Sequence, residues 1–497
     1  MIHALKQINA FVWGVPALFM ILITGVLLSW DTALAQVRLF PRAMRCFFNK
    51  LFARGKGGTV SPFQSLCTAL AATVGTGNIA GVAGALCIGG PGAVFWLWVS
   101  ALLGMVIKFA EAVLCVRYQR RGADNTLLGG PMYMIEHGLG KRFRWLGCVY
   151  CMFGVIAAFG VGNATQVNAV IVGINEVIGW HPSPARDVLL GVGLALASAA
   201  VLLGGAKRIG AFSERLVPFA ALAYILLGLG VIASNLEAVP DAFRSIVLGA
   251  FTPKAVTGGV VGSAFVTLRT GISRGVFTNE AGMGTAGMSY AGARTSHPVE
   301  LGLMGIVEVF VDTVVICTIT ALAVLCSGVT IPYGQDAGAA LTAKAFSATY
   351  GTAGSGLLAL FICLFAFATM IGWGLYGIRC AQYLLGERVW KAFVVVQTVV
   401  VTVVSALGTE TVWLFAETVN GLMAIPNLIA ILALRPVLLA LVKEYRILGG
   451  NAAVGGTYES FDQCKSLRAF SHEKVPSSGC GSRTSGKEDI SSEYWSA

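Results

Sequence analysis

One stretch of the chain combines the residue types that build a binding site inside a membrane. Residues 71–81 read AATVGTGNIAG, with three glycines, two threonines and one asparagine inside an apolar segment long enough to cross a bilayer. Backbone N–H and C=O groups in hydrocarbon must be paired internally, so non-helical chain survives there only where protein covers it or it lines a cavity. A helix broken at this point would present half-helix ends that can hold an anionic carboxylate and a cation.

The composition predicts the class of protein in which this stretch lies. The 497 residues are 56% hydrophobic and only 12% charged, with a mean hydropathy of +0.76. Soluble domains are typically about 25% charged, so we predict a polytopic protein whose partner is the lipid bilayer. The formal net charge of +11 is interpreted as basic cytoplasmic loops, and no nucleic-acid partner is expected.

Apolar runs predict about eleven transmembrane helices, each with the ~20 residues that span a bilayer. Lysine and arginine are concentrated in the loops after odd-numbered spans, which predicts an external N-terminus and a cytoplasmic C-terminus. We therefore expect a transmembrane domain over residues 1–446 and a polar, disordered cytoplasmic tail over 447–497. The expected spans are 11–33, 62–89, 91–118, 146–172, 187–206, 214–235, 256–292, 299–326, 354–384, 391–408 and 411–440.

Without the first span, ten spans remain, or two sets of five. The first span of each set, at 62–89 and 256–292, is rich in glycine and is expected to be interrupted. An odd number of spans per set turns the second set upside down relative to the first. Paired interrupted helices in corresponding positions are typical of inverted-repeat transporters with a central site. The predicted fold is therefore an all-α polytopic protein with one N-terminal helix and a five-plus-five inverted repeat.

Six motifs between residues 72 and 427 carry a resemblance to a known family. They are ATVGTGNIAGVA at 72–83, GGPGAVFW at 89–96, GGPMYMIEHGLG at 129–140, RGVFTNEAGMGTA at 274–286, HPVELGLMGIVEVFVDT at 297–313 and NGLMAIPN at 420–427. With these motifs the chain resembles the alanine/glycine:cation symporters, also called sodium:alanine symporters. The resemblance implies a LeuT-type five-plus-five fold with two broken helices, and co-transport of small neutral amino acids with Na⁺ or H⁺.

The first break supplies the expected carboxylate site. Exposed N–H groups at Thr76, Gly77 and Asn78 can bind a substrate carboxylate at a positive half-helix end. The alternative is simple helix packing through Gly77 and Gly81, which are four residues apart. The resemblance favours the binding role.

Other spans are expected to complete the substrate pocket. Gln166 matches a family glutamine, and its amide can pair with either end of an amino acid; an interhelical hydrogen bond is the alternative. We expect the span at 256–292 to unwind near Thr267 to Gly271, so that Thr270 and Gly271 lie opposite the first break with carbonyls free for the ammonium group. Trp373 resembles the family tryptophan that walls the pocket.

The expected Na⁺ site uses oxygen ligands, which a hard cation prefers. Carbonyls of Ala71 and Val74 lie at the other half-helix end, and Thr369 matches a hydroxyl position that ligates Na⁺ in this fold, with the Phe365 carbonyl beside it. Ala368 departs from the family pattern because serine or threonine is expected there, and this removes one possible ligand.

Carboxylates inside membrane spans are functional candidates by default. Among them Asp312 is the best candidate for carrying a proton, but a buried hydrogen-bonding role is slightly favoured for it; Glu417 is a second candidate for coupling. Glu280 is interpreted as a gate or a helix cap, with the structural role favoured. Glu111 lies one turn from Lys108, which predicts a structural pair.

The leading hypothesis is a secondary active symporter that moves alanine or glycine with Na⁺ across the cell inner membrane. Its alternatives are a proton-coupled transporter of another small amino acid, such as glutamine or serine, and an amino-acid sensor. A channel would need a continuous polar path. An enzyme is not expected, because no nucleophile–base set or metal-ligand spacing is visible. The oligomeric state is not predicted.

Overall fold

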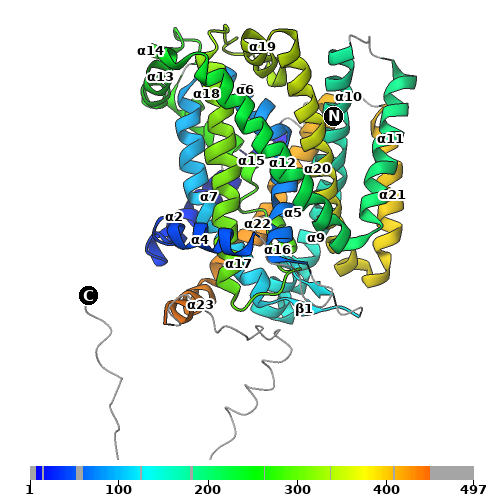
Figure 1. Cartoon of the computed structure of the whole chain (residues 1–497). Coiled ribbons are helices and arrows are strands. Elements are labelled where there is room, and N and C mark those ends of the chain that lie inside the picture. Colours follow the sequence, from blue (N-terminus) through cyan, green and yellow to red (C-terminus); the bar gives the residue numbers. More distant parts are fainter. Residues whose placement is uncertain are drawn as a thin grey trace, which may run out of the picture.

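The computed structural model describes residues 7–9, 11–13, 16–51, 60–123, 126–178, 183–261, 263–335, 337–406 and 409–447. Its long helices pack side by side and run between an upper and a lower end of the molecule (Figure 1). The short helices α13 (Val239–Phe251), α14 (Pro253–Val256) and α19 (Gly338–Tyr350) lie at the upper end, and α4 (Phe40–Lys50) and α23 (Arg435–Ile447) lie at the lower end.

The remaining elements follow in chain order. They are α2 (Pro16–Asp31), α3 (Ala35–Arg38), α5 (Pro62–Thr73), η1 (Gly77–Gly81), α6 (Val82–Gly89), α7 (Gly92–Arg117), the paired strands β1 (Arg120–Arg121) and β2 (Leu127–Leu128), α8 (Pro131–Met134), η2 (Ile135–Leu139), η3 (Lys141–Phe143), α9 (Arg144–Phe159), η4 (Gly160–Ala164), α10 (Thr165–Ile178), α11 (Pro184–Leu202), α12 (Gly205–Ala233), η5 (Leu236–Ala238), α15 (Ala264–Asn279), α16 (Thr285–Tyr290), α17 (Pro298–Val309), η6 (Phe310–Cys317), α18 (Thr318–Cys326), α20 (Thr352–Leu385), η7 (Glu387–Val389), α21 (Trp390–Val404) and α22 (Thr409–Ala433).

The first predicted break is present between α5 and α6. A capping box starts α5, because the Ser61 hydroxyl accepts from the Gln64 N–H while the Gln64 side chain accepts from the Ser61 N–H. The helix ends at Val74, whose φ of −72° and ψ of 97° are extended. The chain then resumes as the π-helical turn η1, and the two parts meet at 53°.

The second break lies further along the chain than predicted. The expected unwinding near Thr267 to Gly271 is wrong, because α15 is continuous over 16 residues from Ala264 to Asn279. The chain leaves the helix at Glu280 and turns through Gly282 and Gly284 before α16 begins. These three residues have φ of 53°, 94° and 76°, the left-handed region that glycine adopts most readily.

The glycines of α15 serve helix packing instead. A Cβ on Gly271 would lie 2.2 Å from the Ala93 carbonyl oxygen, and one on Gly275 would lie 2.0 Å from Ser100 Oγ. Small residues in membrane helices allow this close approach of backbones. They hold α15 against α7, which is enclosed between α15 and α17.

Seven helices in the described ranges are long and apolar enough to cross a membrane, and two bent pairs raise the number to nine. The predicted tenth span corresponds to α21, which has only 15 residues, and the seventh corresponds to α15 with the short α16. With 15 and 16 residues, α21 and α15 are each shorter than a full span, so the number of eleven spans stays a prediction.

The end of the transmembrane region also differs from the prediction. A single span was expected over 411–440, but α22 ends at Ala433 and α23 continues from Arg435 at an angle of 60°. The predicted tail lies outside the described residues from 448 onward, and the side chain of Glu417 also lies outside the described part.

Candidate functional site

The break after α5 frees backbone groups at a buried position. In a continued helix the Gly75 N–H would bond to the Ala71 carbonyl, but it donates to Asn78 Oδ1 at 2.9 Å instead. The Ala71 carbonyl is thereby released at the end of α5. On the other side of the break, the N–H groups of Thr76 and Gly77 find no hydrogen-bond acceptor among the described residues. The Asn78 N–H, which was predicted to be exposed, donates to the Gly75 carbonyl at 3.3 Å instead.

Helix α20 lies directly against this break. A Cβ on Gly75 would lie 2.9 Å from Thr369 Oγ1, and one on Gly372 would lie 2.8 Å from the Ala72 nitrogen. The Thr369 hydroxyl donates to the Phe365 carbonyl at 3.0 Å, and Thr369 is buried, with an exposed fraction of 2%. The structure thus brings the Thr369 hydroxyl and the α5 half-helix end together.

Asn78 and Asp312 form one buried cluster. Asn78 Nδ2 donates to Asp312 Oδ1 at 2.8 Å and to the Asp312 carbonyl at 3.0 Å. Thr313 Oγ1 donates to the other carboxylate oxygen at 2.7 Å. Asn78 and Asp312 are both 0% exposed. The Asn78 side chain therefore links the first break to the π-helical segment η6.

Thr278 of α15 faces the first break, next to Phe277. A Cβ on Gly77 would lie 3.5 Å from Thr278 Oγ1, whereas Thr270 Cβ would lie 3.0 Å from a Cβ on Gly89. Thr270 and Gly271 therefore lie against the junction of α6 and α7, about two helical turns from Thr278. The placement of these two residues opposite the first break is corrected, and its cause is the displaced second break.

Trp373 of α20 links the π-helical segment η4 to the second break. A Cβ on Gly162, within η4, would lie 2.3 Å from Trp373 Cβ. The Trp373 indole N–H donates to Glu280 Oε1 at 2.8 Å, and Thr285 Oγ1 donates to Glu280 Oε2 at 2.8 Å. Gln166 Nε2 donates to the Val161 carbonyl at 3.1 Å, while its Oε1 is buried without a donor among the described residues.

Glu111 holds the second break in place. Its Oε1 accepts from the N–H groups of Gly282 at 2.8 Å and Gly284 at 3.1 Å, and from Asn427 Nδ2 at 2.8 Å. Tyr150 adds a hydrogen bond of 2.9 Å to the Met283 carbonyl. Glu111, Tyr150 and Asn427 are fully buried, so one carboxylate helps to order a turn whose own backbone supplies a bond from the Met283 N–H to the Glu280 carbonyl at 3.2 Å.

The predicted pair between Glu111 and Lys108 is wrong. Lys108 Nζ bonds to Glu308 Oε1 at 3.0 Å on the neighbouring α17, and Tyr290 donates to Glu308 Oε2 at 2.8 Å. A buried charge needs a partner with good geometry, and the helix-to-helix contact supplies it better than a neighbour on the same helix. The motif EAGMG at 280–284 is the signal in the sequence that marks this region as a turn.

These features define a class of protein. The fold resembles the crystal structure of MhsT in complex with L-phenylalanine, with a TM-score of 0.54 and 14% sequence identity, over 79% of this chain and 99% of that chain. This similarity shows the fold alone. With its two broken helices, the protein has an all-α, LeuT-type fold.

The sequence comparisons give the family. The profile of the sodium:alanine symporter family matches residues 1–450. A sodium/alanine symporter of Methanococcus maripaludis is 39% identical over 91% of this chain and 99% of its own. A probable sodium/glutamine symporter of Bacillus subtilis is 36% identical over 89% of this chain and 90% of its own. The chain belongs to the sodium:alanine symporter family.

Proposed function

We propose that the protein carries a small neutral amino acid, alanine or glycine, together with Na⁺ across the cell inner membrane by alternating access. The observation that supports this most directly is the set of freed backbone groups at the first break, beside the Thr369 hydroxyl. Membership of the sodium:alanine symporter family supports the substrate class and the ion.

In this proposal the two sides of the first break have different tasks. The N–H groups of Thr76 and Gly77 bind the substrate carboxylate at a half-helix N-terminus. The carbonyls of Ala71, Val74 and Phe365 and the Thr369 hydroxyl bind Na⁺, which prefers oxygen ligands.

The rest of the substrate is held by residues of other helices. Thr278 replaces Thr270 and Gly271 opposite the break, because its hydroxyl donates to the Arg274 carbonyl at 2.7 Å and keeps lone pairs that can accept from an ammonium group. Gln166 contributes its unpaired Oε1 in the same way. Trp373 forms a wall of the site, and its hydrogen bond to Glu280 connects this wall to the second break.

The distribution of cations supports a cytoplasmic lower end. Arg42, Arg45 and Lys50 lie on α4, and Arg120 and Arg121 form β1 at the same end (Figure 1). Basic residues are retained on the cytoplasmic side, and α23, the C-terminal element that the structure describes, lies at this end as well.

The proposal is tested by uptake of labelled alanine into proteoliposomes under an imposed Na⁺ gradient, with K⁺ in place of Na⁺ as the control and a pH gradient as a second arm. We expect uptake that requires Na⁺. Uptake driven by the pH gradient alone would assign coupling to Asp312 or Glu417 instead. A folded protein that transports no alanine in either arm contradicts alanine as the substrate, and glutamine and serine are then tested as substrates and as ligands of a sensor.

Replacing Thr369 with valine tests the proposed Na⁺ site. Valine has nearly the same shape, so the main loss is one oxygen ligand at the break. We expect the Na⁺ concentration for half-maximal uptake to rise roughly tenfold, in line with the ~1–3 kcal/mol attached to a lost buried polar partner. The matched control is Thr398→Val, because Thr398 makes the same bond to the carbonyl four residues earlier, at 2.8 Å, in α21. Equal Na⁺ dependence in both variants contradicts the assignment.

A further inference from the structure

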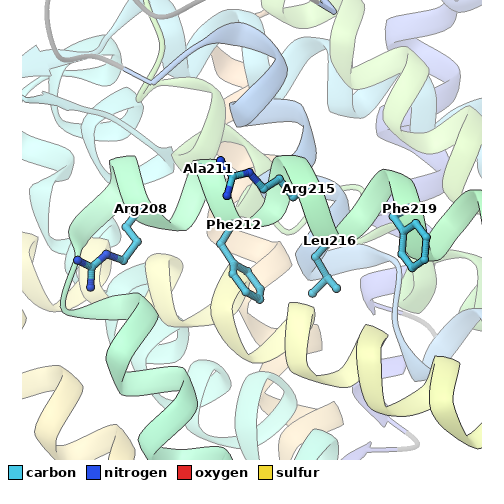
Figure 2. Close-up of a pocket in the computed structure, with 6 residues that line it drawn as sticks. All are labelled: Arg208, Ala211, Phe212, Arg215, Leu216 and Phe219. Atoms are coloured by element: carbon cyan, nitrogen blue, oxygen red, sulfur yellow. The ribbon is translucent and has the colours of Figure 1, made fainter.

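A hollow on the outer face of α12 has a cationic end and an apolar end, which match the headgroup and the acyl chains of an anionic phospholipid. Its volume is about 460 Å³. The lining residues are Arg208, Ala211, Phe212, Arg215, Leu216 and Phe219. They occur at positions i, i+3, i+4, i+7, i+8 and i+11, which is one continuous stripe of an α-helix (Figure 2). The cations occupy the N-terminal part of this stripe, and the apolar side chains extend it toward the middle of the helix.

Both guanidinium groups are directed toward the same end. Figure 2 shows the Arg215 side chain turning back along α12 toward Ala211, as side chains on a helix do. Arg208 is anchored by one hydrogen bond of 2.9 Å to the Ala200 carbonyl, which leaves its other N–H donors free for a ligand. Neither arginine has an ion-pair partner within the described ranges.

The one carboxylate next to this stripe is turned away from it. Glu214 Oε2 accepts from Gln64 Nε2 of α5 at 2.8 Å, on the inner side of α12. The hollow therefore carries two positive charges that no acid among the described residues neutralises. This arrangement is complementary to an anionic headgroup.

The apolar part of the stripe faces the surroundings of the protein. Phe219 is 68% exposed, and Leu222 and Leu226 continue the same exposed face. Phe212 packs edge-on against Phe367 of α20, with ring centroids 5.7 Å apart, which gives the hollow a floor. From Arg208 to Phe219 the helix rises about 16 Å, close to half of the ~30 Å hydrocarbon core. The stripe thus matches the depth of one leaflet.

We propose that this hollow is a binding site for an anionic phospholipid, with the phosphate at Arg208 and Arg215 and an acyl chain along Phe212, Leu216 and Phe219. Basic pockets between membrane helices on the cytoplasmic side bind anionic lipid headgroups, and this hollow lies where Phe212 of α12 packs against Phe367 of α20. The N-terminus of α12 lies on that side in the orientation proposed above. This site is separate from the transport site, and its test does not depend on transport.

The test is binding of fluorescent phosphatidylglycerol to the purified full-length protein in detergent, compared with phosphatidylcholine of the same acyl chains. We expect phosphatidylglycerol to bind at least tenfold more tightly. Arg208→Gln and Arg215→Gln should each weaken its binding about fivefold, and the double variant about thirtyfold. Arg215→Lys keeps the charge and should stay within about twofold of the unchanged protein.

The matched control is Arg244→Gln, because Arg244 is an exposed arginine on α13 at the other end of the molecule. It should leave lipid binding unchanged. Three results would overturn the proposal: equal affinity for the two lipids, an equal loss in the Arg244 variant, or binding of glycerol phosphate alone as tight as that of the lipid. The last result would indicate a site for a free anion.

Discussion

Asn78→Ala is expected to reduce amino-acid uptake at least tenfold while the protein still inserts in the membrane. The side chain accepts from the Gly75 N–H at the break and donates to Asp312 Oδ1 on η6. Its loss leaves this N–H and this carboxylate oxygen without partners in a fully buried place, while Thr313 still donates to Asp312 Oδ2. Each such group costs about 1–3 kcal/mol. Uptake of labelled alanine by proteoliposomes with equal amounts of folded protein measures the effect.

The control is Asn235→Ala, since Asn235 also donates from its amide, to the Val231 carbonyl at 3.0 Å, but lies at the end of α12 away from both breaks. Uptake by this variant should stay within about twofold of the unchanged protein, as for most substitutions away from such networks. If Asn78→Ala transports as well as Asn235→Ala, the amide does not shape the site.

Asp312→Asn separates the two roles assigned to Asp312. The amide oxygen can still accept from Asn78, and the Thr313 hydroxyl can reverse its bond, so the geometry is preserved while the charge is removed. With a hydrogen-bonding role, Na⁺-driven uptake persists. With a proton-carrying role, any uptake driven by the pH gradient disappears. The same two gradient arms used above read out the difference.

The first break was predictable because its cause is local. Glycine, threonine and asparagine at 75–78 cannot all be explained by packing in an apolar span, and a helix that ends there must expose backbone groups. The second break was misplaced because Gly271 and Gly275 carry the same composition signal but serve the contact with α7. Composition cannot separate a glycine that unwinds a helix from one that admits a neighbouring backbone.

Pairing between distant carboxylates and their donors was harder to predict. Lys108 and Glu111 are one turn apart, which favours a pair on one helix, yet each finds its partner on another segment. Asn78 and Asp312 were both selected as candidates, but their direct bond depends on η6 lying against η1. Contacts of this kind are decided by tertiary packing, which a single sequence does not display.

The largest loss of function is expected for Glu111→Ala. Three buried donors converge on one oxygen of this carboxylate, two of them backbone N–H groups of the turn between α15 and α16. Removing the acceptor leaves the Gly282 and Gly284 N–H groups unpaired, at ~1–3 kcal/mol each, whereas Asn427 Nδ2 keeps its bond to the Gly282 carbonyl at 2.8 Å. The turn keeps the bond from the Met283 N–H to the Glu280 carbonyl at 3.2 Å but loses the acceptor that fixes its two glycines. Glu280, which receives the Trp373 hydrogen bond, is then held less firmly beside the pocket wall.

We therefore expect uptake by Glu111→Ala to fall below about a hundredth of that of the unchanged protein, with a lower melting temperature in detergent. Glu111→Gln keeps an acceptor oxygen but loses the charge, and charge-assisted bonds are roughly twice as strong as neutral ones, so an intermediate loss is expected. The matched control is Glu387→Ala: Glu387 also accepts from a backbone N–H, that of Ala123 at 2.8 Å, and from Arg120, but its side chain is 28% exposed. Water replaces such partners at little cost. Both variants remove a carboxylate acceptor, but only Glu111 contacts the second break. Equal losses of uptake in the two variants would therefore mean that the Glu111 carboxylate does not organise this break.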